Sequence, residues 1–158
     1  MTAGHLAPAA PDPAVDATAG PGPGTPTPTD WDLLVVLMGA PYADDGVSTA
    51  LRWVESVARA GGRVQVWTCG YATLLTQRAL GESKPRDVLG TTSPPLSSAA
   101  WVDSLIASSS GRARWLSCRY CSEERGATDH VDAVRVRPAT AFHRHVGESA
   151  KTVVAGVI

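Results

Sequence analysis

Two cysteines stand close together where an apolar segment of the chain gives way to a polar one. Cys118 and Cys121 form a Cys-x-x-Cys pair directly after residues 113–117. A thiolate at the junction of a strand and a helix is stabilised by free backbone N–H groups and by the helix dipole, so its pKa tends to fall. The pattern therefore predicts a reactive thiol site, beside which Arg119 and Arg125 either supply positive charge or form a solvated helix face.

Strands and helices alternate along the chain and must position these thiols. The continuous apolar run at residues 32–38 is typical of a parallel strand that is covered on both faces. Further strands are expected at residues 64–69, 113–117, 131–136 and 151–158. Helical spacing is found at residues 50–58, 71–80, 102–106, 120–125 and 139–146. This alternation predicts an α/β fold with a parallel sheet and helices on both of its faces.

In such sheets the functional site lies outside the carboxyl ends of the strands. Three segments should share that edge: the loop at 39–46, Cys69 with its neighbour Gly70, and the turn at 118–121. The long connection at 81–96 leaves from near the opposite end, so no catalytic role is assigned to it.

Composition separates an N-terminal tail from one domain. Residues 1–29 are mostly Pro, Ala, Gly and Thr and cannot bury enough apolar surface to fold, so they are expected to be disordered, whereas residues 30–158 can hold one hydrophobic core. The net charge of −1, with interspersed signs, disfavours nucleic-acid binding. With no apolar stretch long enough for a bilayer and no secretion signal, we expect a cytoplasmic protein without membrane contact. An odd count of three cysteines then argues against a disulfide framework.

The first loop offers a second candidate group. Tyr42 precedes Asp44 and Asp45, and these side chains either help to bind an acceptor or small ligand, or belong to an ordinary hydrophilic loop. The chain has no Gly-x-Gly-x-x-Gly or Gly-x-x-x-x-Gly-Lys-Ser/Thr motif, so no nucleotide or other cofactor is expected.

From about residue 32 to residue 158, the chain resembles the DsrE/DsrF-like family of small sulfur-relay proteins, which includes the TusD type. The resemblance rests on Gly39-Ala40-Pro41-Tyr42, on Ala50-Leu51-Arg52, and on the Cys-x-x-Cys-x-x-x-Arg-Gly pattern that starts at Cys118. It implies a compact α/β domain with a five-stranded, mostly parallel sheet, as in flavodoxin-like layering. It also implies a homo- or hetero-oligomer. The sequence departs from the family at Arg119, where a small residue is usual, and in the basic segment 134–138.

The resemblance also implies roles for the thiols. The family's sulfur-carrying cysteine stands eight positions before the glycine of Arg-Gly, which is Cys118 here. Its thiolate would take sulfane sulfur from a donor protein, hold it as a persulfide and pass it to an acceptor, as a carrier rather than a turnover enzyme. Cys121 would resolve the persulfide, form a protective disulfide, or be a passive neighbour. Cys69 would face the same edge or, as free cysteines often do, lie in the core.

Three alternatives stay open. The chain could be a non-catalytic module that binds a ligand or partner at the sheet edge, or a dithiol redox protein that uses the Cys-x-x-Cys pair. A zinc site would need that pair together with histidines. His143 and His145 are two positions apart on a predicted helix and so lie on different faces, and these histidines, with His130, are expected at the surface.

Overall fold

The computed structural model describes residues 29–41, 46–79 and 97–156. Its elements, in chain order, are β1 (Trp31–Leu37), α1 (Gly46–Arg59), β2 (Val64–Thr68), the 3₁₀ helix η1 (Gly70–Thr76), α2 (Ser98–Ser108), β3 (Ala113–Cys118), α3 (Arg119–Glu124), β4 (Val134–Arg137), the 3₁₀ helix η3 (Ala139–Ala141), α4 (Phe142–Gly147) and β5 (Ser149–Ala155). Nearly all of the predicted tail, Tyr42 with its acidic neighbours, and the connection at 81–96 lie outside the described residues.

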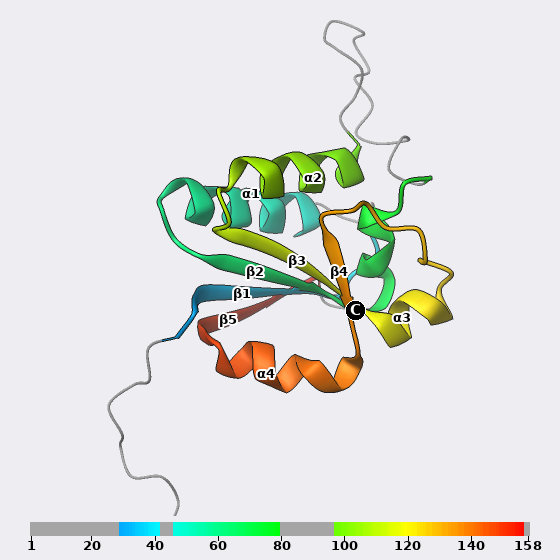
Figure 1. Ribbon diagram of the computed structural model, residues 1–158. Helices are drawn as coiled ribbons and strands as arrows, with labels where there is room; N and C mark the ends of the chain where they lie inside the picture. The colour runs from blue at the N-terminus through cyan, green and yellow to red at the C-terminus, as the bar shows by residue number, and fades with distance from the viewer. Residues whose placement is uncertain (1–28, 42–45, 80–96, 157–158) are drawn as a thin grey trace, which may run out of the picture.

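The five strands form one sheet in the order β4-β3-β2-β1-β5, and every neighbouring pair is parallel. Helices α1 and α2 cover one face, α4 covers the other, and α3 lies at the edge where the strands end (Figure 1). The predicted α/β domain with a five-stranded sheet is therefore confirmed, and the sheet is parallel throughout the described strands rather than mostly parallel.

The two faces of the sheet bury separate apolar clusters because alternate side chains of a strand point to opposite faces. In β1, Val35 and Leu37 pack with α1 and α2, whereas Leu34 and Val36 belong to the cluster on the α4 side. Burial on both faces explains why β1 reads as one continuous apolar run. The cluster on the α4 side also contains Cys118 and Cys121, so the thiol site lies at the end of a core layer.

Several elements differ in their bounds from the prediction, and a helix and a strand near the site show why. The helix expected at 71–80 is the 3₁₀ helix η1, which ends at Thr76 because Gln77 is extended and forms a β-bridge with His130. The fourth strand starts at Val134 instead of residue 131, since the N–H of Val134 bonds to the carbonyl of Val131 and closes a turn there.

The ends of β1 and β5 approach each other closely at two glycines. Gly156 has a φ of +78°, and a Cβ built on it would lie 2.8 Å from the backbone nitrogen of Gly39. A side chain there would force the two backbones apart, so this contact requires glycine. It fixes where the first loop leaves the sheet.

Within the described segments, no helix is both long and apolar enough to cross a bilayer.

A polar cluster joins the end of α4 to the first residues of β2 and β3. Arg114 of β3 donates hydrogen bonds to Gln65 Oε1 at 2.6 Å and to Glu148 Oε2 at 2.9 Å, and its Nη2 lies 3.0 Å from His145 Nδ1. Gln65 in turn donates to the backbone carbonyl of His145. His145 was expected at the surface but is only 3% exposed, because it packs against the Trp67 ring.

Acidification should destabilise the fold through His145. Burial, followed by the charge of Arg114, lowers its pKa below the usual value of 6.5, with Arg144 acting in the same direction and Glu148 opposing it. Its contribution to stability is therefore complete above about pH 6.5 and is lost as the pH falls toward its folded pKa. Denaturant titrations at several pH values should show a falling free energy of unfolding between pH 7 and pH 5.

Helix α4 contains both the histidine to be tested and a matched control, His145 and His143. His145→Gln should flatten this dependence, whereas His143→Gln at an exposed position should preserve it. Some pH dependence of the free energy of unfolding should persist in both variants, because burial also lowers the pKa of His130. An unchanged slope in His145→Gln would contradict the assignment.

Candidate functional site

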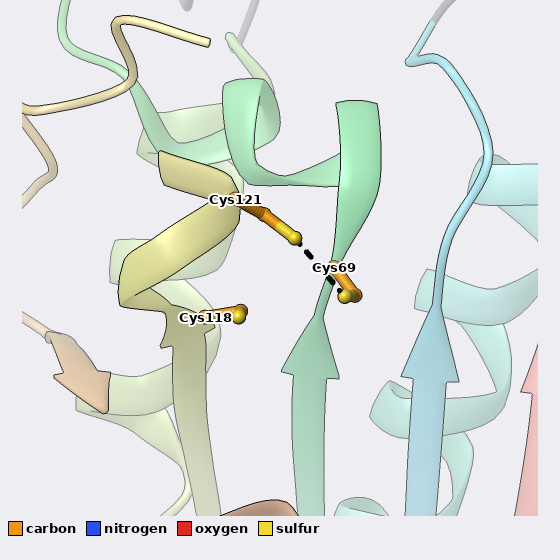
Figure 2. Close-up of side chains that lie close together, drawn as sticks. All are labelled: Cys69, Cys118 and Cys121. Carbon is orange, nitrogen blue, oxygen red and sulfur yellow. Dashed lines mark hydrogen bonds between the residues drawn. The ribbon is translucent and has the colours of Figure 1, made fainter. Parts of the chain in front are cut away.

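Three cysteines meet at the carboxyl edge of the sheet. Figure 2 shows Cys69 after β2, Cys118 at the end of β3 and Cys121 in α3, with the side chains of Cys69 and Cys121 directed toward each other. The Sγ atoms of Cys69 and Cys121 are 3.2 Å apart, and all three Sγ atoms lie within 4.8 Å of one another. Cys118 and Cys121 are buried, with 2% and 8% exposure, and Cys69 is half-buried.

The local sequence explains how these thiols converge. Thr68 pairs with Ser117 in the parallel register of β2 and β3, so the residues that follow them, Cys69 and Cys118, lie side by side at the strand ends. Helix α3 begins immediately after Cys118, and its first turn brings Cys121 back over the strand ends. The three segments predicted to share this edge therefore do so, as far as the first loop is described.

Gly70 allows the chain to turn at the site. Its φ is +57°, and a Cβ on it would lie 3.0 Å from the carbonyl oxygen of Met38. The positive φ and the close carbonyl oxygen both disfavour a side chain, so this position requires glycine. The same turn directs the Gly70 N–H toward the sulfur of Cys121.

The electrostatics favour a thiolate on Cys121 rather than on Cys118. Burial tends to raise the pKa of Cys121, but the Gly70 N–H and the thiols of Cys69 and Cys118 outweigh it, and with the charge of Arg125 they bring this pKa below 9.0. Burial raises the pKa of Cys118, although the backbone N–H of Cys121 opposes the shift. Burial and the hydrogen bond to Cys121 raise the pKa of Cys69 to about 12.

The expectation of a lowered pKa at the strand-to-helix junction is thus wrong for Cys118 and right for its neighbour. The first turn of a short helix stabilises a thiolate only modestly, and for Cys118, the more deeply buried of the two, desolvation outweighs it. When the cluster ionises, Cys121 is the favoured site of the negative charge, because the other two thiols donate hydrogen bonds to its sulfur.

The two candidate arginines differ in their relation to the thiols. Arg125 lies near Cys121, with its guanidinium 4.9 Å from the Tyr71 ring centroid and 2.6 Å from a carboxylate oxygen of Glu124. Arg119 is exposed and lines a different pocket, of about 250 Å³. Of the two arginines, Arg125 is therefore the one whose charge acts on Cys121.

An apolar pocket of about 210 Å³ opens beside the thiols. Cys69 and Cys118 line it, together with Val36, Met38, Trp67, Ala139 and Phe142. Trp67 and Phe142 are in ring contact, with centroids 5.3 Å apart, and form its wall. A thiol in this pocket meets a ligand in surroundings almost free of polar groups.

A chain of hydrogen bonds holds α3 in place. Ser122 Oγ lies 3.0 Å from Ser117 Oγ and 3.2 Å from His130 Nε2, and His130 Nδ1 lies 2.8 Å from Thr76 Oγ1. Because Ser122 follows Cys121 directly, these bonds to β3 and η1 set the direction in which the Cys121 thiol points. They also engage His130, which is half-buried rather than on the surface as expected.

Some of the site could not be read from the sequence. Cys69 had been expected at this edge or in the core, and its contact with Cys121 depends on strand register, which leaves no local sequence signal. The sequence pattern carries no signal that Trp67 and Phe142 would line the site. The histidines of the predicted zinc alternative do not join the thiols: among the described residues, the group with metal-ligand spacing consists of the three cysteines alone.

No protein-family model matches the sequence, and no curated protein matches it either. Among solved structures, the chain is similar to the YchN protein from E. coli, with a TM-score of 0.60 and 15% sequence identity over 78% of this chain and 98% of that one. The chain has a DsrE-like fold. At this identity the likeness establishes the fold alone.

The pKa order of the thiols can be measured directly. The rate of alkylation by iodoacetamide, followed against pH for each cysteine by peptide mass spectrometry, should give Cys121 the lowest apparent pKa and Cys69 the highest. The apparent pKa is the useful quantity because access affects the rate but not the midpoint.

Arg125→Gln should raise the apparent pKa of Cys121, because a positive charge that favours the thiolate is removed. Tyr120→Ala changes an exposed side chain of the same helix and should leave the midpoint unchanged. Titration of Cys118 before Cys121 would contradict this account.

Proposed function

We propose that the protein carries sulfur as a persulfide on Cys118 and passes it to an acceptor. The observation on which this rests is that Cys118 lines the apolar pocket while its neighbour, Cys121, is the thiol with the lowered pKa. Cys118 can thus meet a sulfur donor and has a proton acceptor beside it. The DsrE-like fold and the resemblance of the motif at Cys118 to sulfur-relay proteins support the same assignment.

Cys121 acts as the base in the transfer. The Cys118 sulfur attacks the terminal sulfur of a donor persulfide, R–S–SH, as its proton moves to the Cys121 thiolate. The sulfur–sulfur bond of the donor breaks and R–S⁻ leaves, so Cys118 becomes Cys118–S–SH and Cys121 becomes a neutral thiol. An adjacent base is a common way to activate a nucleophile whose own pKa is too high. Delivery to an acceptor thiolate reverses these steps.

The pocket favours donors whose reacting end carries little charge. Its walls are side chains such as Val36, Trp67 and Phe142, which cannot compensate a buried charge. We propose that the partner is a protein that inserts a cysteine persulfide, carried on a short segment, into this pocket. We also propose that the protein forms an oligomeric assembly with such partners.

Intact mass spectrometry tests the carrier assignment. Incubation with a persulfide donor should add about 32 Da to the protein, the mass of one sulfur atom. Peptide mapping should place the addition on Cys118, and a thiol acceptor should remove it. Cys118→Ala should gain no stable sulfur, while Tyr120→Ala should match the wild type.

The role of Cys121 is tested separately by kinetics. Cys121→Ser should slow loading by about 100-fold or more near neutral pH, because a general base is lost. The rate should recover at alkaline pH, where Cys118 ionises without help. Loading on Cys121 instead of Cys118 would overturn the residue assignment, and no loading of the wild type would overturn the carrier function.

A dithiol redox function is the second candidate, and the structure favours a different pair for it than the sequence did. The sulfurs of Cys69 and Cys121 lie 3.2 Å apart, within hydrogen-bond distance, although the two residues are far apart in the sequence. A disulfide compound that acts as the oxidant would first form a mixed disulfide with the Cys121 thiolate and release one of its two thiols. That step removes the thiolate whose hydrogen bond and charge help to raise the pKa of Cys69. Cys69 could then attack Cys121 and release the second thiol of the oxidant.

Oxidised glutathione is a suitable oxidant for this reaction. Peptide mapping without reduction should identify a Cys69–Cys121 disulfide, which should still form in Cys118→Ala. The two electrons pass to glutathione, which leaves as two thiols. A Cys118–Cys121 disulfide as the main product would reject the pair inferred from the geometry.

A further inference from the structure

We propose that Cys69, Cys118 and Cys121 also form a binding site for one Cu(I) ion, held by the three sulfurs. This inference does not depend on sulfur carriage. It rests on the third cysteine, which converts a pair of neighbouring thiols into a three-sulfur group that spans two strand ends and a helix (Figure 2).

The distances suit a single ion. A metal–sulfur bond of about 2.3 Å places three ligand sulfurs about 4.0 Å apart when they surround an ion in a plane. The observed separations, 3.2 Å for Cys69 and Cys121 and at most 4.8 Å within the group, lie on either side of this value. Small side-chain rotations would therefore complete the triangle without movement of β2, β3 or α3.

The type of ligand selects a soft metal. Thiolate and thioether sulfur favour Cu(I) and Zn(II) over the hard cations that prefer oxygen. Within the described residues, no histidine or carboxylate joins the group with metal-ligand spacing. Met38, a further soft donor, lines the pocket beside Cys69 and Cys118.

The surroundings favour Cu(I) over Zn(II). Zinc sites are almost always tetrahedral and fill a fourth position with another protein ligand or with water. Here the open side of the cysteine group faces Val36, Trp67 and Phe142, which give a water molecule no hydrogen-bond partner. Cu(I), which can be bound by three sulfurs without a fourth ligand, therefore suits this pocket better than Zn(II).

Binding would be a ligand exchange without a change of oxidation state. The ion leaves its carrier ligands, and the thiols that coordinate it release their protons to solvent. The positive charge of Arg125 beside Cys121 offsets part of the negative charge of the thiolates. Because the same sulfurs are used, a bound ion would block persulfide formation on Cys118.

Competition with a chromophoric Cu(I) chelator tests the site on the reduced full-length chain under anaerobic conditions. We expect one Cu(I) per chain, and X-ray absorption spectra with three sulfur neighbours. Each of Cys69→Ser, Cys118→Ser and Cys121→Ser should weaken binding at least about 100-fold, since the loss of even an outer-shell partner often costs about 10–100-fold. Tyr120→Ala, which changes an exposed side chain between Cys118 and Cys121, should bind as the wild type does.

The outcomes separate this proposal from the carrier function. Wild-type affinity in Cys69→Ser would reduce the site to the Cys-x-x-Cys pair and overturn the three-sulfur assignment. Tighter binding of Zn(II), measured with a zinc indicator, would overturn the choice of metal. Folding of each variant is checked by circular dichroism, and a cysteine-to-alanine series replaces any serine variant that unfolds. Sulfur loading is measured on separate, metal-free samples, so either result can fail alone.

Discussion

All five strands of the sheet run in the same direction, and this constraint creates the site. Parallel strands end at a common edge, so residues that follow different strands become neighbours regardless of their separation in the chain. The register of β2 against β3 then decides which residues meet, because Thr68 lies beside Ser117 and the next residues are Cys69 and Cys118. The first turn of α3 adds Cys121 to this pair. The third thiol of the site thus comes from sheet topology rather than from the Cys-x-x-Cys motif.

Crowding of three sulfurs makes their protonation states interdependent. A second thiolate beside the first would meet both repulsion and desolvation, so the group favours a single negative charge. Ionisation is favoured at Cys121, whose pKa is lowered by the Gly70 N–H, two thiol donors and Arg125. The pKa values of Cys118 and Cys69 are raised, so these two thiols are the hydrogen-bond donors to Cys121. In the proposed chemistry the cluster acts as one unit, in which one sulfur is favoured to ionise and another faces the pocket.

The strands and their direction could be predicted from the sequence because local signals encode them. The apolar run of β1 marks a strand buried on both faces, and the Cys-x-x-Cys pair marks a strand-to-helix junction. Properties that depend on distant segments could not be predicted. The contact of Cys69 with Cys121 follows from register, the early end of η1 follows from the bridge between Gln77 and His130, and the burial of His145 follows from its packing on Trp67.

The opposite pKa shifts of Cys118 and Cys121 show why a motif is an incomplete guide to reactivity. The helix-start argument treats both cysteines alike, yet the two differ in burial and in hydrogen-bond donors. The same difference separates the reactions proposed for the cluster. Persulfide formation on Cys118 needs one proton acceptor, a Cys69–Cys121 disulfide needs an oxidant for two electrons, and Cu(I) needs the protons of its ligands to leave. The redox state and metal supply around the protein would therefore decide among these reactions, while the arrangement of three sulfurs stays the same.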